Sequence, residues 1–192
     1  MKRVAVLQSN YLPWKGYFDI IDQVDILVFY DDVQYTKNDW RNRNIIQTAQ
    51  GEQWITIPVQ ASLSQRICDI TLTTCHWQRK HWATIRQAYS KAPFFIEYAD
   101  WLEHFYLGSE WRSLSDANQT LIRYLAASCI GITTQFLDSR DFDLSGRKGT
   151  RLLDLLTQLD ATHYLSGPSG RSYLDEAPVS YTHLRAHETT PH

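Results

Sequence analysis

The strongest constraint on the fold is a strand, helix, strand pattern within the first 30 residues. The run Arg3–Gln8 has the short apolar pattern of a buried strand, and Trp14–Gln23 has apolar residues at helical spacing. The next run, Asp25–Tyr30, is almost continuously apolar, as expected of a parallel strand that is covered on both faces. Together these runs predict one βαβ unit and therefore a parallel sheet.

The rest of the chain adds an insertion and then returns to the same alternation. Short β-rich runs predict a small antiparallel insertion, and apolar residues at helical spacing then predict a block of helices over 76–131. The β-rich runs are 44–47, 53–59 and 67–73, and the final strand, helix and strand are expected at 133–137, 150–159 and 162–165. We therefore predict an α/β fold with a mainly parallel, Rossmann-like sheet, a small antiparallel insertion and a helical middle block.

The length of 192 residues suits one domain with a substantial core. We expect residues 1–177 to form a single α/β domain. From Pro178 the sequence reads PVSYTHLRAHETTPH, which has no helical or strand period and resembles translated read-through. We expect residues 178–192 to be a disordered artefact outside the fold.

Charge and hydrophobicity narrow the classes of partner. The chain has 19 basic and 21 acidic residues, so its net charge of −2 creates no general attraction to nucleic acid or anionic membrane. No apolar run approaches the roughly 18 residues that a membrane-spanning helix needs, and the first residues become polar too soon for a signal peptide. We expect a cytoplasmic protein that binds a small molecule, with no nucleic acid and no membrane span.

Ligands of open α/β sheets bind at the carboxyl ends of the strands, so the loops there are the candidate site. The first such loop precedes a predicted helix whose N-terminus could hold an anion. Its binding candidates are Gln8, Asn10, Tyr11 and Trp14. A helix cap with an aromatic side chain packed on the sheet would explain these residues equally well.

The loop after the second strand has the highest density of polar groups in the chain. Three carboxylates, three cations and three asparagines lie within 14 positions. Arg41 and Arg43 alternate, so an extended segment would direct both toward a phosphate or carboxylate. A carboxylate here could act as a base, although a solvated loop is the alternative. The catalytic candidates are Asp31, Asp32, Lys37 and Asp39, and the binding candidates are Asn38, Trp40, Arg41 and Arg43.

A third loop follows the last predicted strand. Its two glycines permit close backbone approach, and its serines and arginine suit a phosphate. The candidates are Ser166, Gly167, Ser169, Gly170 and Arg171. The spacing differs from a Walker A loop, and a tight turn that caps a helix is the competing interpretation.

The sequence predicts no metal site and requires no cofactor. His76 and His81 are five residues apart, whereas two zinc ligands on one helix face are four apart, and no C-x-x-C pair is present. Mg²⁺ would be expected only if the donor substrate is a nucleotide.

Three segments resemble the WbqC-like protein family, bacterial proteins that occur in surface-polysaccharide (O-antigen) gene clusters. They are QSNYLPWKGYFDIIDQVDILVFYDDVQYTKNDWRNRNII, WITIPV and YLSGPSGRSYLD, and the resemblance covers Lys2–Glu176. Ser9 stands where family members usually have Pro. Members also continue past SGPSGR, so the resemblance implies that the C-terminal part of the domain is missing from 1–177.

The resemblance implies a transferase that moves an acyl or aminoacyl group to an amino sugar or nucleotide sugar in lipopolysaccharide O-antigen biosynthesis. A non-catalytic module that binds a nucleotide sugar is the alternative. A weaker likeness of Pro13–Tyr17 to the H-x-G-H signature suggests a divergent nucleotidylyl-transferase-like enzyme, but aromatic residues replace both histidines.

Overall fold

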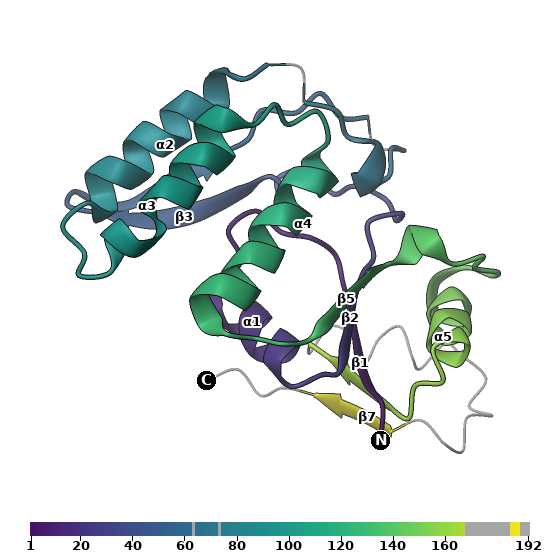
Figure 1. Cartoon of the computed structure of the whole chain (residues 1–192). Helices are drawn as coiled ribbons and strands as arrows, with labels where there is room; N and C mark the ends of the chain where they lie inside the picture. Colours follow the sequence, from purple (N-terminus) through teal and green to yellow (C-terminus); the bar gives the residue numbers. More distant parts are fainter. Residues whose placement is uncertain (63, 73, 168–184, 189–192) are drawn as a thin grey trace. The chain divides into compact units, whose positions relative to one another are not determined.

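The computed structural model describes residues 1–62, 64–72, 74–167 and 185–188 (Figure 1). The chain divides into two compact units. The sheet unit comprises Met1–Gln8, Trp14–Asp31 and Ala126–His192, and the hairpin unit comprises Ser9–Pro13 and Asp32–Leu125. The two units are described separately below.

A parallel sheet forms the sheet unit, as the βαβ pattern predicts. Its strand order is β5-β2-β1-β6-β7, and every neighbouring pair is parallel. The strands are β1 (Arg3–Leu7), β2 (Ile26–Phe29), β5 (Gln135–Asp138), β6 (His163–Ser166) and β7 (Arg185–Glu188). With the antiparallel hairpin and the helices described below, this confirms the predicted α/β class.

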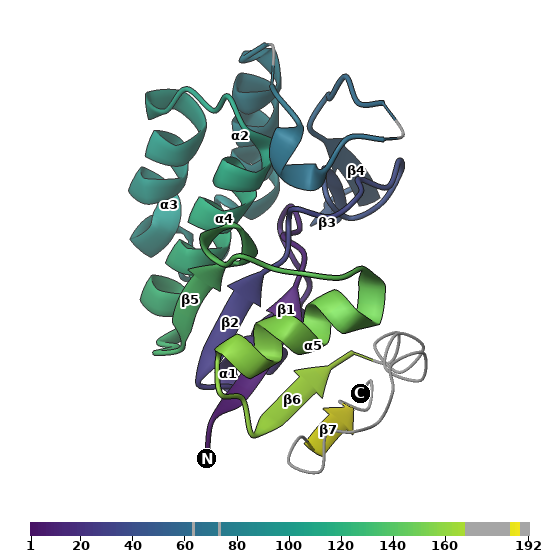
Figure 2. The ribbon, with the colours of Figure 1, turned by 90° about the vertical axis from the view of Figure 1, so that its right-hand side faces the viewer.

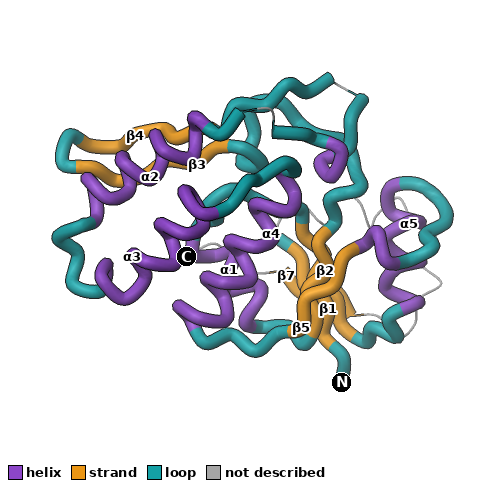
Figure 3. Tube along the Cα trace, turned by 45° about the horizontal axis from the view of Figure 1, so that its top comes forward, coloured by secondary structure: helices purple, strands orange, loops and turns teal. Residues whose placement is uncertain are grey.

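Two helices cover opposite faces of this sheet. Helix α1 (Lys15–Asp22) and helix α5 (Lys148–Gln158) lie on either side of the strands (Figures 2 and 3). On the α5 face, Val4 and Val28 pack with Leu155 in a cluster of buried residues. Alternate residues of each strand face opposite ways. Both faces of β2 and of the middle of β1 are buried, and the residues there are apolar.

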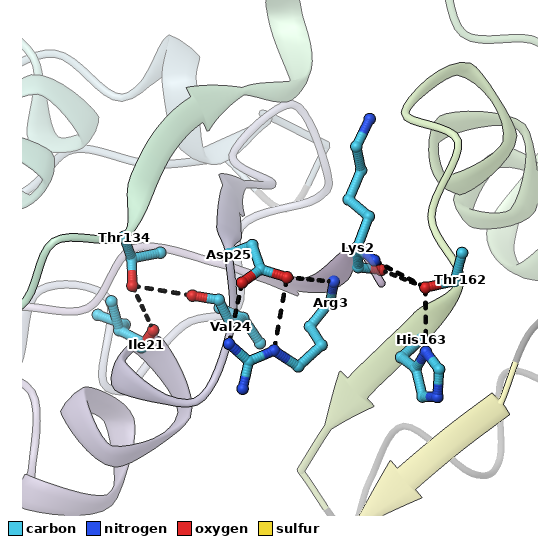
Figure 4. A network of polar contacts seen from close by, with 8 residues as sticks. All are labelled: Lys2, Arg3, Ile21, Val24, Asp25, Thr134, Thr162 and His163. Atoms are coloured by element: carbon cyan, nitrogen blue, oxygen red, sulfur yellow. Dashed lines mark hydrogen bonds and ion pairs between the residues drawn. The ribbon is translucent and has the colours of Figure 1, made fainter.

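Polar contacts join the amino ends of the strands (Figure 4). The Arg3 backbone N–H donates to the Asp25 carboxylate at 2.7 Å, and the Arg3 guanidinium donates to the same carboxylate. The Thr134 hydroxyl lies 2.7 Å from the Ile21 carbonyl oxygen, and the Thr162 hydroxyl contacts the Lys2 backbone. These contacts fix the connections before β2, β5 and β6.

The hairpin unit contains a two-stranded antiparallel sheet and three α-helices. Strands β3 (Arg43–Thr48) and β4 (Gly51–Thr56) pair with Asn44 opposite Ile55. Gly51 has φ of 106°, a left-handed value that glycine adopts without steric cost in a tight turn. The helices are α2 (His76–Tyr89), α3 (Phe95–Glu103) and α4 (Leu114–Tyr124), and π-helical segments η2 (His104–Gly108) and η3 (Leu125–Ile130) follow α3 and α4.

One predicted strand is wrong. The described part of this run, 67–72, contains a 3₁₀ turn, η1 (Ile67–Asp69), and within it only Thr71 forms a bridge, to Ser113. Ile67 and Ile70 are both completely buried. Their spacing of three suits a turn of 3₁₀ helix, whereas a strand would place them on opposite faces.

The tail contains one element that the sequence does not predict. Arg185–Glu188 form β7 and pair in parallel with β6. Backbone pairing along a strand edge needs no side-chain pattern, so a sequence without strand period can still pair there. The read-through origin of 178–192 and the single-domain boundary at 177 stay predictions.

No helix among the described residues is long and apolar enough to cross a membrane.

Candidate functional site

The carboxyl ends of β1 and β6 bring together predicted residues of the sheet unit. The chain passes from β1 to β2 on one side and later to β6 on the other, so the strand order reverses at β1. Such a reversal is where open α/β sheets bind ligands. Gln8 follows β1, and Ser166 and Gly167 lie at the end of β6. Asp31, just beyond β2, is completely buried, and Ser166 is also buried.

The same edge contains polar residues that the sequence analysis missed. Asp138 ends β5 and is buried beside Ser139. The Arg140 guanidinium binds the Asp138 carboxylate with two hydrogen bonds of 2.8 and 2.9 Å. Asp138–Asp141 directly follow the predicted strand 133–137, so the rule that selected the other loops would have found these residues if it had been applied after this strand as well.

Trp14 lies at the N-terminus of α1 with 58% of its surface exposed. It provides no side-chain cap, and the first turn of α1 contains no acidic residue. The backbone N–H groups of this end therefore carry the positive end of the helix dipole without a local carboxylate. The predicted residues Ser169, Gly170 and Arg171 lie outside the described residues.

Arg41 is held in place by three other parts of the hairpin unit. Its guanidinium donates to the Asn10 side-chain oxygen and lies 3.6 Å from the Asp39 carboxylate. The Asn118 side chain of α4 donates to the Arg41 carbonyl oxygen at 2.8 Å. The structure thus brings together Asn10 from the first predicted loop with Asp39 and Arg41 from the second.

Asp39 is arranged as a stable anion. Its carboxylate accepts hydrogen bonds from the Thr36 hydroxyl and the Trp40 backbone N–H. Partial burial raises the pKa of Asp39, but these hydrogen bonds and the charges of Arg41 and Arg43 outweigh it, so the pKa lies below its ordinary value. Asp39 is therefore ionised at neutral pH and suits orientation of Arg41 better than proton abstraction.

Trp40 and Trp54 form an exposed aromatic surface. Their rings stack with centroids 5.6 Å apart and planes at 23°, and 46% and 48% of the two residues is exposed. The Arg43 guanidinium lies 4.6 Å from the centroid of a Trp54 ring and donates to the Asn38 carbonyl oxygen. We call Trp40, Trp54 and Arg43 the tryptophan platform. Trp54 was not predicted, because it lies in β4 and not in a loop after a parallel strand.

Asparagines fix the loops that carry these residues. Asn44 donates to the carbonyl oxygens of Tyr11 and Leu12. Leu12 has φ of 49°, a costly conformation for a residue with a side chain, and these bonds hold it there. Asn38 also has a left-handed φ, which asparagine tolerates well. Lys37 and Asn38 are exposed in the same loop, and Asp32 is half-buried.

Tyr11 lies in the core of the hairpin unit. It is completely buried, and its hydroxyl contacts His81 Nδ1 at 2.8 Å and the Tyr106 hydroxyl at 2.6 Å. Burial raises the pKa of both tyrosines. The ligand contact that the sequence predicts for Tyr11 would therefore require this core to open.

His81 joins this buried cluster to a pocket. Burial lowers its pKa to about 4 from an ordinary value of 6.5, so the ring is neutral at pH 7, and a hydrogen bond with the Thr56 backbone acts in the opposite direction. Its ring contacts Trp77 one helical turn away, but its other aromatic contacts, Tyr11 and Tyr106, are 70 and 25 positions away. No local sequence signal could have indicated this role.

The pocket lies between β4 and the first turns of α2 and has a volume of about 450 Å³. Aromatic, apolar and polar side chains line it: Gln53, Trp54, Ile55, Thr56, Pro58, Thr74, His76, Trp77, Lys80, His81 and Thr84. Such a volume and mixed lining are typical of small-molecule sites. The sequence analysis considered His76 and His81 only as zinc ligands and did not predict the pocket.

Within the part of the chain that the structure describes, no group of three or more His, Cys, Asp or Glu residues could hold a metal ion.

Comparison with known proteins places the chain in a family. Residues 8–187 match the model of the WbqC-like protein family. The uncharacterized protein Rv1507c of Mycobacterium tuberculosis (strain ATCC 25618 / H37Rv) is 48% identical over 178 residues, which span 92% of this chain and 77% of the relative. No solved structure matches the chain significantly. The chain therefore belongs to the WbqC-like protein family.

Proposed function

We propose that this protein is a cytoplasmic transferase that binds a nucleotide-linked sugar and transfers an acyl or aminoacyl group to an amino sugar. Its biological context would be bacterial surface-polysaccharide (O-antigen) biosynthesis, as the family resemblance implies. The observation that carries the proposal is the tryptophan platform beside Arg41. A stacked, half-exposed indole pair with the Arg43 guanidinium over one ring, and with Arg41 directly after Trp40 in the chain, combines the two chemistries that such a substrate needs.

The aromatic part of the platform suits a ring. Trp40 and Trp54 each leave about half of their surface open to solvent, so a planar base or the apolar face of a sugar could extend the stack. An exposed tryptophan pair in a hairpin has no packing reason to stay uncovered, because burial of each ring would stabilise the fold. A bound ring would supply that cover.

The cationic part suits a phosphate. Guanidinium groups bind phosphate oxygens through paired hydrogen bonds. Arg41 is oriented by Asn10 and Asp39, and Arg43 is oriented by Trp54 and the Asn38 carbonyl oxygen. Both groups are thus ordered before a ligand binds, which lowers the entropy cost of binding.

The proposed reaction needs a base for one proton. The amino nitrogen of the sugar attacks the carbonyl carbon of an activated acyl donor, such as a thioester or an aminoacyl ester. A C–N bond forms and the bond to the donor's sulfur or oxygen breaks. A carboxylate accepts the ammonium proton and passes it to the leaving thiolate or alkoxide, which departs as a thiol or an alcohol. Asp32, which belongs to the same unit as the platform, is the candidate, with Lys37 as a charge partner, because Asp39 is a weak base.

The experiment is calorimetric titration with a panel of nucleotide sugars, followed by turnover assays with acyl and aminoacyl donors. We expect binding that Arg41→Ala weakens by about tenfold or more, since a charge-assisted phosphate contact is worth about 1.5–3 kcal/mol. Arg112→Ala is the matched control, because Arg112 is largely exposed in the same unit. Unchanged binding after Arg41→Ala would disprove the site.

The alternative function is a non-catalytic module that holds a nucleotide sugar. The platform favours it as much as it favours an enzyme, because stacking and phosphate contacts need no base. Binding without turnover for every donor class would establish the module and exclude the transferase.

A further inference from the structure

The pocket of the hairpin unit has an aromatic side and a size that suits a small ring compound. Trp54 lines the pocket and is 48% exposed overall, and Pro58 and Trp77 add apolar surface. A volume of about 450 Å³ lies within the usual range for small-molecule sites. A monosaccharide with one substituent fills such a space, and its C–H faces pack well on indole rings.

The pocket lining also contains a cation. Lys80 lines the pocket, and none of the described lining residues is acidic. His76 and Trp77 begin α2, a helix of 14 residues with no side-chain cap at Cys75 and no acidic residue in its first turn. The positive end of the helix dipole therefore adds to the Lys80 charge. This combination selects an anion.

A buried donor in the same wall is also consistent with a ligand. Trp77 is 4% exposed, and its indole N–H has no hydrogen-bond partner among the described residues. Buried donors without an acceptor are rare because they cost about 1–3 kcal/mol. An oxygen of a bound ligand is an acceptor of the right kind.

We propose that this pocket binds a sugar phosphate, with the sugar ring against Trp54 and the phosphate at Lys80 and the N-terminus of α2. This inference rests on the proposed function for the kind of ring and deepens it, because it assigns the sugar end of the substrate to a defined subsite. Phosphate is favoured over carboxylate because an ammonium group and a helix N-terminus together form a common phosphate site.

The test is a titration of the full chain with glucosamine 1-phosphate, monitored by calorimetry and by tryptophan fluorescence. Glucosamine, inorganic phosphate and glucuronate are the comparison ligands. We expect glucosamine 1-phosphate to bind more tightly than all three, and Lys80→Ala to weaken it by about tenfold, since one charge-assisted contact is lost. Trp54→Ala should weaken binding of glucosamine and glucosamine 1-phosphate alike.

Lys91→Ala is the matched control, because Lys91 is exposed and does not line the pocket. Equal weakening by Lys80→Ala and Lys91→Ala would show a general charge effect and overturn the proposal. Equal affinity for glucuronate would overturn the phosphate assignment, and no binding of glucosamine 1-phosphate at millimolar concentration would overturn the site.

The result separates this inference from the proposed function. One outcome is that nucleotide sugars bind and turn over while Lys80→Ala leaves the affinity for both nucleotide sugar and glucosamine 1-phosphate unchanged. In that case the pocket assignment fails and the transferase stands. If glucosamine 1-phosphate binds through Lys80 while no nucleotide sugar binds, the proposed function fails and the phosphate pocket stands.

Discussion

The sheet unit and the hairpin unit bury their interiors by different means. In the sheet unit, the side chains between the sheet and α5 are mainly Val, Ile and Leu. Polar contacts gather at the amino ends of the strands (Figure 4) and at Asp138 and Arg140 after β5. In the hairpin unit, Tyr11, His81 and Tyr106 form a hydrogen-bonded cluster inside an aromatic core. Asn42, also buried, binds the Tyr35 hydroxyl and the Ile57 carbonyl oxygen.

This difference determines which substitutions each unit tolerates. An apolar core depends on burial and shape, and similar hydrophobic side chains can often replace one another. A buried polar cluster stabilises the fold only when each group has its hydrogen-bond partner. Single substitutions in it are therefore costly, and its stability depends on the protonation of its members. The hairpin unit should therefore respond to pH and to loss of single hydrogen bonds, and the sheet unit to loss of volume.

Phe29→Ala should have the largest effect on stability. Phe29 is completely buried in β2, and its ring stacks on Phe136 with centroids 5.7 Å apart. Removal of a buried phenyl ring costs about 3–5 kcal/mol. Urea unfolding followed by far-UV circular dichroism measures this loss. Phe94→Ala is the control, because Phe94 is 64% exposed and its loss should cost little. Similar losses for both variants would contradict the assigned core.

Acidification should destabilise the hairpin unit through His81. Its pKa is about 4 in the folded chain and 6.5 ordinarily, so between these values the unfolded chain binds a proton that the folded chain does not. Stability is therefore complete above pH 6.5 and falls as the pH drops toward 4. The total loss is about 3 kcal/mol, at about 1.4 kcal/mol for each tenfold change in proton affinity.

Tryptophan fluorescence isolates this effect, because six of the seven tryptophans belong to the hairpin unit. His81→Gln removes the titrating group, so its free energy of unfolding should vary less between pH 6.5 and 4 than that of the unchanged chain. An equal pH dependence in both chains would assign the effect to other groups.

The fold of the sheet unit was largely predictable from sequence. The apolar runs at β1 and β2 and the helical spacing of α1 are local signals, and each element begins and ends within about two residues of its expected position. In the hairpin unit, the start of α4 also follows a local signal, since the Ser113 hydroxyl accepts from the Asp116 backbone N–H. Local patterns suffice where each strand is buried on both faces.

The candidate site was predictable only in part. The rule that ligands bind beyond parallel strands led to Arg41 and Trp40, although these lie in the hairpin unit. It missed Trp54, Lys80 and His81, because they come from a hairpin strand and a helix that tertiary packing brings together. Pairing between residues about 30–70 positions apart leaves no periodic signal in a single sequence.

Asn44→Ala should have an intermediate effect on the free energy of unfolding. It removes the hydrogen bonds to the Tyr11 and Leu12 carbonyl oxygens, at 3.2 and 2.5 Å, and frees the strained Leu12 backbone. We expect a loss of about 2 kcal/mol, as for other partly buried hydrogen-bond networks. Fluorescence-detected unfolding measures it. Asn44→Asp keeps the acceptor for the Ile45 N–H but loses both donations, so it should cost almost as much, and a neutral result would contradict the role.

Compared with Phe29→Ala and Asn44→Ala, Trp40→Ala should change the free energy of unfolding least and the affinity for a ligand most. Trp40 is 46% exposed, so its truncation removes little buried surface and should shift the free energy of unfolding by under about 1 kcal/mol. Its ring still offers a face for stacking, worth about 1–3 kcal/mol per base, so nucleotide-sugar affinity should fall by about fivefold to a hundredfold. Calorimetry and urea unfolding on one preparation measure both. Trp40→Phe, which keeps an aromatic face, should recover part of the affinity. If Trp40→Ala strongly destabilised the fold and left ligand affinity unchanged, Trp40 would be a packing residue of the hairpin unit. The tryptophan platform would then not be a ligand-binding surface.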